Sequence, residues 1–293
     1  MRSGRWAGGV AAALAVTLAG CGLVSPLEPD DPAEPLPVIE IGADQTATSE
    51  LLAELYVAAL QAKNEPAVVV QVVPGTETLA LADNSPMAMP LFAATVLQEY
   101  TNEPLPTDSA DTIVQLATAV APEIGVLETS KLDGALVWAA TPESGLTSLT
   151  QLAELSSSST LAAPSFAMTM SSGVPALQVA YGAALTVDQV DDPGERAAAL
   201  VSGEVVAALF RRTEVTDLDG LVELDDPIQV LTPDPLVVAV SSQFAEQRPD
   251  AVLVLEAVQT ALDEDAYAEL VAAAAADGLE PAIAEWLKAR RLA

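Results

Sequence analysis

The sequence predicts an α/β fold in which strands and helices alternate. Strand-like runs at Val38–Gly42 and Ala67–Val73 are each followed by a segment with helical spacing or a turn into a helix. The run Ala67–Val73 is continuously apolar and β-branched, which is typical of a strand buried on both faces of a parallel sheet. After a last strand at Leu236–Val240 the chain is wholly helical. These observations favour mainly parallel sheets covered by helices.

The remaining elements follow from the same patterns. Apolar residues from Leu51 to Leu60 recur at helical spacing, and Thr46 and Thr48 precede them as candidate N-caps. The other predicted strands are Met87–Met89, Ile124–Leu127, Gly134–Ala140, Leu161–Ala163 and Val205–Phe210. The other predicted helices are Asp108–Val120, Thr147–Leu155, Val174–Tyr181, Gly194–Val201, Asp250–Leu262, Asp263–Ala276 and Pro281–Leu292.

The N-terminus has the form of a bacterial lipoprotein signal. Arg2 and Arg5 give a positive n-region, Trp6–Gly20 gives an apolar region, and the sole cysteine, Cys21, ends the sequence Leu-Ala-Gly-Cys. We expect residues 1–20 to be a signal peptide, Cys21 to carry lipid, and the acidic, proline-rich stretch 21–37 to be a tether. The alternative is an ordinary secretory signal with an incidental cysteine. A membrane-spanning helix is disfavoured because the apolar run is shorter than roughly 20 residues.

Composition excludes several functions. The chain has 293 residues, of which 51% are hydrophobic, so it can form a sizeable core. Its formal net charge is −31, which disfavours binding to nucleic acid or to anionic lipid head groups. There is no histidine, so imidazole metal sites and the commonest general base are absent. No catalytic constellation and no cofactor site is evident, and we expect the protein not to be an enzyme.

Four stretches of the mature chain are similar to those of a known family. They are Ile41–Leu60, Pro74–Leu79, Ser172–Gly182 with Ala197–Val205, and a tail that includes Gln247–Asp250, Asp263–Leu270 and Asp277–Leu292. In this order and spacing they resemble the substrate-binding proteins of bacterial ABC importers for glycine betaine, choline and related quaternary amines. The resemblance covers most of the mature chain.

The resemblance implies a type II periplasmic-binding-protein fold, in which two lobes joined by two crossovers bind a ligand between them. Residues 38–132 and 235–293 would form one lobe and residues 133–234 the other. The crossovers would lie near Lys131–Gly134 and Thr232–Pro235, where turn residues stand beside apolar strands. The implied partners are the permease and ATPase subunits of an importer.

The family's aromatic cage, which holds a quaternary ammonium by cation–π attraction, is only partly matched. A Tyr-Pro-Glu-Tyr-Thr-Gly-Thr stretch of the family corresponds here to Met89–Thr95, which keeps Pro90 and Thr95 and has Phe92 as its aromatic residue. Polar candidates follow strands at their carboxyl ends, where α/β proteins bind ligands. The candidate ligand-binding residues are Asp44, Gln45, Thr46, Thr76, Phe92, Phe166, Phe210 and Arg211. The aromatic candidates are also compatible with core packing.

Two alternatives remain open from the sequence. Arg211 and Arg212 are the one adjacent basic pair in the middle of the folded chain, and arginines bind carboxylate or phosphate bidentately. They could clamp a small anionic ligand, or they could balance nearby acidic residues. The protein could also be a degenerate family member that acts as a sensor or an accessory lipoprotein.

Overall fold

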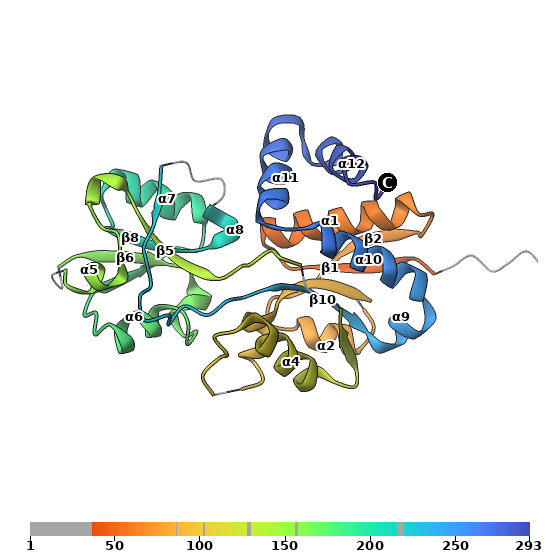
Figure 1. Cartoon of the computed structure of the whole chain (residues 1–293), viewed down its shortest axis with the longest axis horizontal. Helices are drawn as coiled ribbons and strands as arrows, with labels where there is room; N and C mark the ends of the chain where they lie inside the picture. The colour runs from red at the N-terminus through yellow and green to blue at the C-terminus, as the bar shows by residue number, and fades with distance from the viewer. Residues whose placement is uncertain (1–36, 86, 102, 128–129, 156–157, 216–219) are drawn as a thin grey trace, which may run out of the picture. The chain divides into compact units, whose positions relative to one another are not determined.

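The computed structural model describes residues 37–293 except 86, 102, 128–129, 156–157 and 216–219. The predicted signal peptide, Cys21 and all but the last residue of the predicted tether therefore lie outside the described residues. Residues 37–293 form one compact unit that contains two five-stranded sheets. The chain passes from the first sheet to the second and returns, so it crosses between them twice (Figure 1).

The first sheet has the strand order β2-β1-β3-β10-β4. Its strands are β1 (Ile39–Ala43), β2 (Ala67–Gln71), β3 (Ala88–Phe92), β4 (Ile124–Val126) and β10 (Leu236–Ser241). β1 runs parallel to β2 and β3, whereas β10 runs antiparallel to β3 and β4. β10 is the strand that the chain inserts when it returns from the second sheet, and all six of its residues are buried.

The second sheet has the order β7-β6-β8-β5-β9. Its strands are β5 (Leu136–Ala140), β6 (Thr160–Ala163), β7 (Thr186–Gln189), β8 (Ala207–Arg211) and β9 (Val222–Glu223). β6 is parallel to β7 and β8, and β5 is antiparallel to β8 and β9. Each sheet thus contains one strand next to a crossover, β10 or β5, that runs antiparallel to both of its neighbours.

Helices cover the faces of both sheets. The first sheet carries α1 (Ala47–Ala62), α2 (Glu77–Ala82), α3 (Ala93–Leu97), α4 (Ser109–Val120), α9 (Ser242–Gln247), α10 (Pro249–Ala261), α11 (Glu264–Asp277) and α12 (Leu279–Ala289). The second carries α5 (Leu149–Ala153), α6 (Val174–Ala180), α7 (Pro193–Ser202), α8 (Arg212–Val215) and the 3-10 turns η1 (Pro142–Ser144) and η2 (Ser165–Met168).

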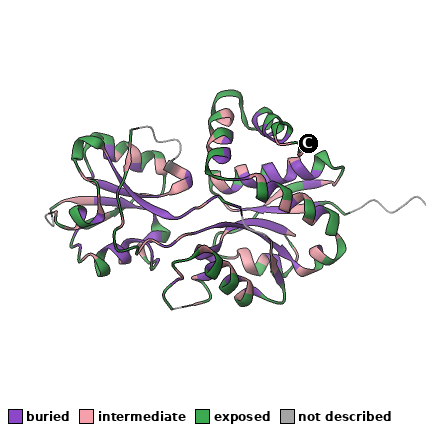
Figure 2. Cartoon of the chain, in the orientation of Figure 1, coloured by how far each residue is buried: buried purple, intermediate pink, exposed green. Residues whose placement is uncertain are grey.

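The C-terminal helices pack with α1 in the largest apolar core. Tyr56 of α1 is fully buried there, and its hydroxyl donates to Gln259 Oε1 of α10 at 2.7 Å. Trp286 of α12 donates its indole N–H to the Ala266 carbonyl of α11 at 2.9 Å. The buried residues follow the sheets and the inward faces of these helices (Figure 2). The C-terminal helices thus pack on the part of the chain that holds β1 and α1.

The predicted α/β class and its two lobes are confirmed, but three expectations were wrong. The sheets are mixed rather than mainly parallel, because β10 and β5 run antiparallel to their neighbours. β2 is an edge strand, and Val68 on it is 45% exposed, so the apolar run is not buried on both faces. The strand expected at Met87–Met89 extends instead from Ala88 to Phe92.

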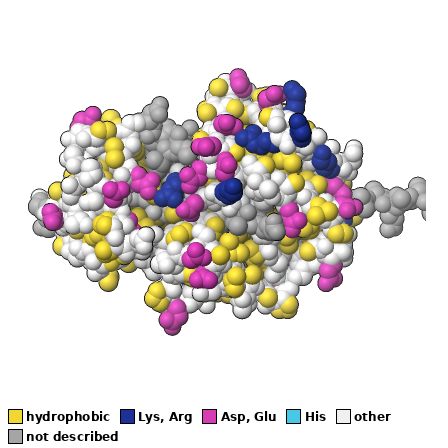
Figure 3. Space-filling view, in the orientation of Figure 1, with side chains coloured by type: hydrophobic (Ala, Val, Ile, Leu, Met, Phe, Trp, Pro, Cys, Tyr) yellow, Lys and Arg dark blue, Asp and Glu magenta, His cyan; other side chains and the backbone are white. Residues whose placement is uncertain are grey.

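Acidic side chains are scattered over the visible face of the molecule (Figure 3), as expected for a solvated acidic surface. In the part of the chain that the structure describes, no helix is both long and apolar enough to cross a membrane.

Candidate ligand-binding site

A cavity of about 400 Å³ lies at the carboxyl ends of β1, β2 and β3. Residues of the second sheet's lobe, Phe166, Arg211 and Glu214, complete its wall. This volume is within the range of small-molecule sites, roughly 300–1,000 Å³. The cavity is therefore the candidate ligand-binding site.

Carboxylates of the chain lie next to the starts of α1 and α2, beside the cavity. Asp44 follows β1, and its Oδ1 accepts hydrogen bonds from Thr46 N at 2.8 Å and from Thr46 Oγ1 at 2.6 Å. Thr46 Oγ1 in turn accepts from the Ser49 N–H and so caps α1, as the sequence predicts. Glu77 begins α2, and its Oε1 accepts from the Gly75 N–H at 3.0 Å.

A third carboxylate caps the start of α3. Asp234 lies in the second crossover, with its side chain only 3% exposed. Its Oδ1 accepts from the N–H groups of Ala94 at 2.6 Å and Thr95 at 3.2 Å. Its Oδ2 accepts from Thr95 Oγ1 at 2.6 Å. Negative charge is stabilised at a helix N-terminus, so positions that suit an anionic ligand group already hold an acidic side chain.

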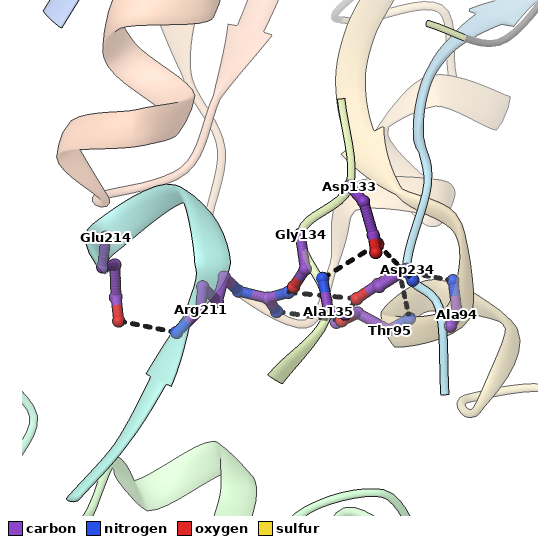
Figure 4. A network of polar contacts seen from close by, with 8 residues as sticks. All are labelled: Ala94, Thr95, Asp133, Gly134, Ala135, Arg211, Glu214 and Asp234. Atoms are coloured by element: carbon purple, nitrogen blue, oxygen red, sulfur yellow. Dashed lines mark hydrogen bonds and ion pairs between the residues drawn. The ribbon is translucent and has the colours of Figure 1, made fainter. Parts of the chain in front are cut away.

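Arg211 ends β8 and reaches from the second lobe to the first (Figure 4). Its Nη1 donates to Asp234 Oδ2 at 3.0 Å and to the Gly134 carbonyl at 3.1 Å. Its Nη2 donates to Thr95 Oγ1 at 2.9 Å. The backbone N–H of Arg211 donates to Glu214 Oε2 at 2.9 Å. Among the described residues, the one basic side chain in the cavity wall is thus paired with an aspartate of the chain itself.

The same guanidinium lies over two aromatic rings of the cavity wall. Its Cζ is 4.8 Å from the Phe92 ring centroid and 5.0 Å from the Phe166 centroid. Both distances are within the reach of a cation–π interaction. The backbone of Gly134 lies directly against Phe92, since a Cβ at this glycine would come within 2.3 Å of Phe92 Cε1. Glycine at 134 therefore allows the first crossover to pass beside the ring.

Arg212 does not join Arg211 in the cavity. Its Nη1 donates to Asp133 Oδ2 at 2.7 Å and its Nη2 to Glu223 Oε1 at 3.0 Å. It lines a different, polar cavity of about 290 Å³. Asp133 also accepts the Asp234 N–H at 2.8 Å. Arg211 thus pairs with Asp234 of the second crossover and Arg212 with Asp133 of the first. The two arginines do not converge on a shared anion site.

Six of the eight candidate ligand-binding residues line the cavity, namely Asp44, Gln45, Thr46, Phe92, Phe166 and Arg211. The other two are not brought there. The Thr76 hydroxyl donates to the Val73 carbonyl at 2.8 Å, and its neighbours Gly75 and Glu77 line the cavity instead. Phe210 is fully buried in the core of the second lobe, with Arg196 Cζ 5.0 Å from its ring centroid.

Four acidic residues at the site are not distinguished in the sequence from the rest of its 42 acidic residues. Glu77, Glu99 and Glu214 line the cavity, and Asp234 lies behind Arg211. Glu214 is tied by a 2.7 Å ion pair to the fully buried Arg196. Burial, with a contribution from Glu77, raises the pKa of Glu99. No described residue gives the Glu99 carboxylate a hydrogen bond or ion pair, and no described group of acidic residues could hold a metal ion.

Comparison with known proteins identifies the family. The family model described as the substrate binding domain of ABC-type glycine betaine transport systems matches residues 37–289. The chain belongs to this family. No curated protein sequence matches it. Members of the family are extracytoplasmic solute-binding proteins that serve an ABC permease and ATPase rather than enzymes.

Solved structures agree on the fold. A glycine betaine/carnitine/choline ABC transporter protein has a TM-score of 0.71 at 18% identity, over 87% of this chain and 99% of that chain. Lactococcal OpuAC complexed with glycine betaine has 0.65 at 12%, over 87% and 96%. A choline binding protein in complex with choline has 0.60 at 15%, over 87% and 89%. At these identities the likeness concerns the two-lobed fold.

Proposed function

We propose that this family member is a lipid-anchored, extracytoplasmic binding protein for a quaternary amine of the glycine betaine or choline class, which it delivers to an ABC permease. The observation that carries the proposal is the charge of the cavity wall. Asp44, Glu77, Glu99 and Glu214 face one basic residue, Arg211. Because Arg211 is paired with Asp234, the wall keeps an excess of negative charge, which favours a cation.

The apolar part of the wall supports the same ligand class. A quaternary ammonium has no N–H to donate, so it depends on aromatic faces and on removal from water. Phe92 and Phe166 are the aromatic residues of the wall, and Leu52, Leu91 and Val96 add apolar surface. Two structures of the same fold are reported with choline and with glycine betaine. That likeness supports the ligand class and the delivery to a permease.

The anionic alternative has less support. Arg211 and Arg212 each hold an aspartate and direct their side chains to different cavities. The start of α3 already holds Asp234, and Asp44 and Glu77 lie next to the starts of α1 and α2. An anionic ligand would have to displace these carboxylates or lie close to them.

Calorimetric titration with choline, glycine betaine and the dianion succinate tests the ligand class. The wild type should bind at least one of the two amines and not succinate. Glu99→Gln removes a cavity carboxylate that has no described partner, so it should weaken choline binding about two- to fivefold. Glu246→Gln removes an exposed charge on α9, outside the cavity, and is the matched control. Binding of succinate alone would establish the anionic alternative, and binding of none of the three would favour a sensor or accessory lipoprotein.

Cell fractionation tests the lipid anchor. Cys21 is the only cysteine, and it ends a segment with the form of a lipoprotein signal. Cys21→Ser should move the protein from the membrane fraction to the soluble fraction with an unchanged thermal unfolding midpoint. A variant that stays in the membrane fraction after a high-salt wash would disprove lipid attachment at this residue.

A further inference from the structure

The guanidinium of Arg211 already makes, within the chain, the contacts that a ligand cation would need. It lies over the rings of Phe92 and Phe166, with Cζ 4.8 and 5.0 Å from their centroids. It also neutralises Asp234 across a 3.0 Å ion pair. Aromatic faces and a buried carboxylate are the two features that stabilise a cation in a pocket, and here one side chain of the protein uses both.

Arg211 and the two rings line the same cavity, so the guanidinium lies where a ligand cation would contact both rings. The first crossover lies against Phe92 at Gly134, so the backbone occupies the space next to the ring there. Phe92 also lines the cavity, and the Arg211 guanidinium, which is part of the same wall, lies over its ring. Phe166 is 41% exposed on η2, and the Arg211 guanidinium lies 5.0 Å from its ring centroid. A quaternary ammonium placed over both rings would coincide with the guanidinium.

We propose that Arg211 is a specificity-determining residue that competes with the ligand, so that a quaternary ammonium group reaches Phe92 and Phe166 only when the Arg211 side chain leaves them. The nature of the ligand rests on the proposed function above, but the competition itself is a property of this chain. The competition lowers the affinity for weak ligands, because a ligand must interact more favourably with the two rings and Asp234 than the Arg211 side chain does.

The contacts of Asp234 show that the exchange is feasible. When Arg211 leaves, the carboxylate keeps its hydrogen bonds from Ala94 N, Thr95 N and Thr95 Oγ1. Asp234 therefore remains satisfied and in place, and its negative charge becomes available to the incoming cation. Arg211 keeps its own position on the backbone through the bond from its N–H to Glu214. The side chain can move without unfolding the end of β8.

Titration with tetramethylammonium chloride tests the competition, because this ion has neither a carboxylate nor a hydroxyl. The full chain, purified from membranes in a non-ionic detergent, is used at constant ionic strength. Arg211→Ala frees both rings and Asp234, and it should bind tetramethylammonium at least about tenfold more tightly than the wild type. Arg211→Lys keeps a cation beside the rings, so its gain in affinity should be smaller than that of Arg211→Ala.

Two further variants separate competition from a general gain of negative charge. Arg212→Ala is the matched control, since it removes an adjacent arginine that also pairs with a crossover aspartate but lies outside the cavity. It should leave the affinity unchanged. In the wild type, the Phe166 ring contacts a cation both before binding (Arg211) and after it (the ligand), so Phe166→Ala should change the affinity for tetramethylammonium little. In the Arg211→Ala background, Phe166→Ala should abolish most of the gain in affinity. Arg211→Gln replaces Arg211→Ala if the latter does not fold.

The outcomes are distinct for the two proposals. If the wild type binds choline and folded Arg211→Ala binds tetramethylammonium no more tightly than the wild type, the competition is refuted and the proposed function stands. If the wild type binds no amine but Arg211→Ala binds tetramethylammonium, the competition is supported and the proposed function is refuted. If neither protein binds tetramethylammonium and the wild type also binds neither choline nor glycine betaine, both proposals are refuted, because vacating the rings should create a site.

Discussion

Asp234 and Asp133 offer a direct test of how the crossovers are held. Each is hydrogen-bonded through Oδ1 to backbone N–H groups and through Oδ2 to one arginine. The substitution to asparagine keeps Oδ1 as an acceptor and replaces the charged acceptor by an amide. Asp234→Asn and Asp133→Asn are therefore the same chemical change at two levels of burial.

The structure sets the expected magnitudes. The side chains of Asp234 and Arg211 are 3% and 14% exposed, and removing one partner of a buried pair costs about 3–5 kcal/mol. Because asparagine keeps the Oδ1 bonds from the Ala94 and Thr95 N–H groups, we expect about 3 kcal/mol for Asp234→Asn. The side chains of Asp133 and Arg212 are 24% and 32% exposed, and such a pair contributes about 0–1 kcal/mol. The two free energies of unfolding should differ by about 2 kcal/mol or more.

Urea unfolding followed by tryptophan fluorescence measures both costs. Trp138 lies in the core of the second lobe and Trp286 in that of the first, so the signal reports on both. Added salt should reduce the cost of Asp133→Asn more than that of Asp234→Asn, since exposed charges are screened more strongly. Equal losses for the two variants, or a larger loss for Asp133→Asn, would refute the assignment of Asp234 as the buried anchor.

Three further predictions concern single residues. Phe210→Ala should lower the free energy of unfolding by about 3–5 kcal/mol, measured in urea, and a loss below about 1 kcal/mol would contradict full burial. Gly134→Ala should cost about 1–3 kcal/mol through its clash with Phe92, and the added change Phe92→Leu should recover part of the loss in the same assay. Burial and the hydrogen bond to Asp226 raise the pKa of Tyr181 from 10.0 to about 12. The stability from this proton is complete below pH 10 and lost as the pH rises through 12, so wild-type stability should fall more steeply there than that of Tyr181→Phe.

Local signals made much of the fold predictable. The helix after β1 carries its apolar spacing and its capping threonine in the sequence itself, and Thr46 caps α1 in the structure. The three C-terminal helices were likewise found within a few residues of their bounds. The sheet order was not accessible in this way. β10 inserts between β3 and β4, strands far from it in the sequence, and nothing in the residues of β10 gives its direction. The edge position of β2 depends on the same long-range arrangement.

The site was harder to predict than the fold, for two physical reasons. Phe210 and Arg211 were both expected at the ligand, yet adjacent residues of a strand point to opposite faces of the sheet. Phe210 packs in the core and Arg211 faces the cavity, so the pleat of β8 could have excluded one of them. The acidic residues could not be predicted from local geometry in this way, because the role of each depends on the arginine with which it pairs. Asp234 meets Arg211 only when the two lobes have formed.

The charged side chains near the cavity bear on the charge of the ligand. Three arginines of the second lobe are each paired within the chain, Arg196 with Glu214, Arg211 with Asp234, and Arg212 with Asp133. The opposite charges within each pair cancel, so the pairs help to hold the cavity wall in place but add little net charge to it. The carboxylates of Asp44, Glu77 and Glu99 have no such counter-ion among the described residues. A ligand that brings positive charge completes this arrangement, whereas an anion would add to charge that is already uncompensated. The acidic wall and the two phenylalanine rings thus support the proposed cationic ligand, with electrostatic attraction supplying part of the binding that additional aromatic rings would otherwise give.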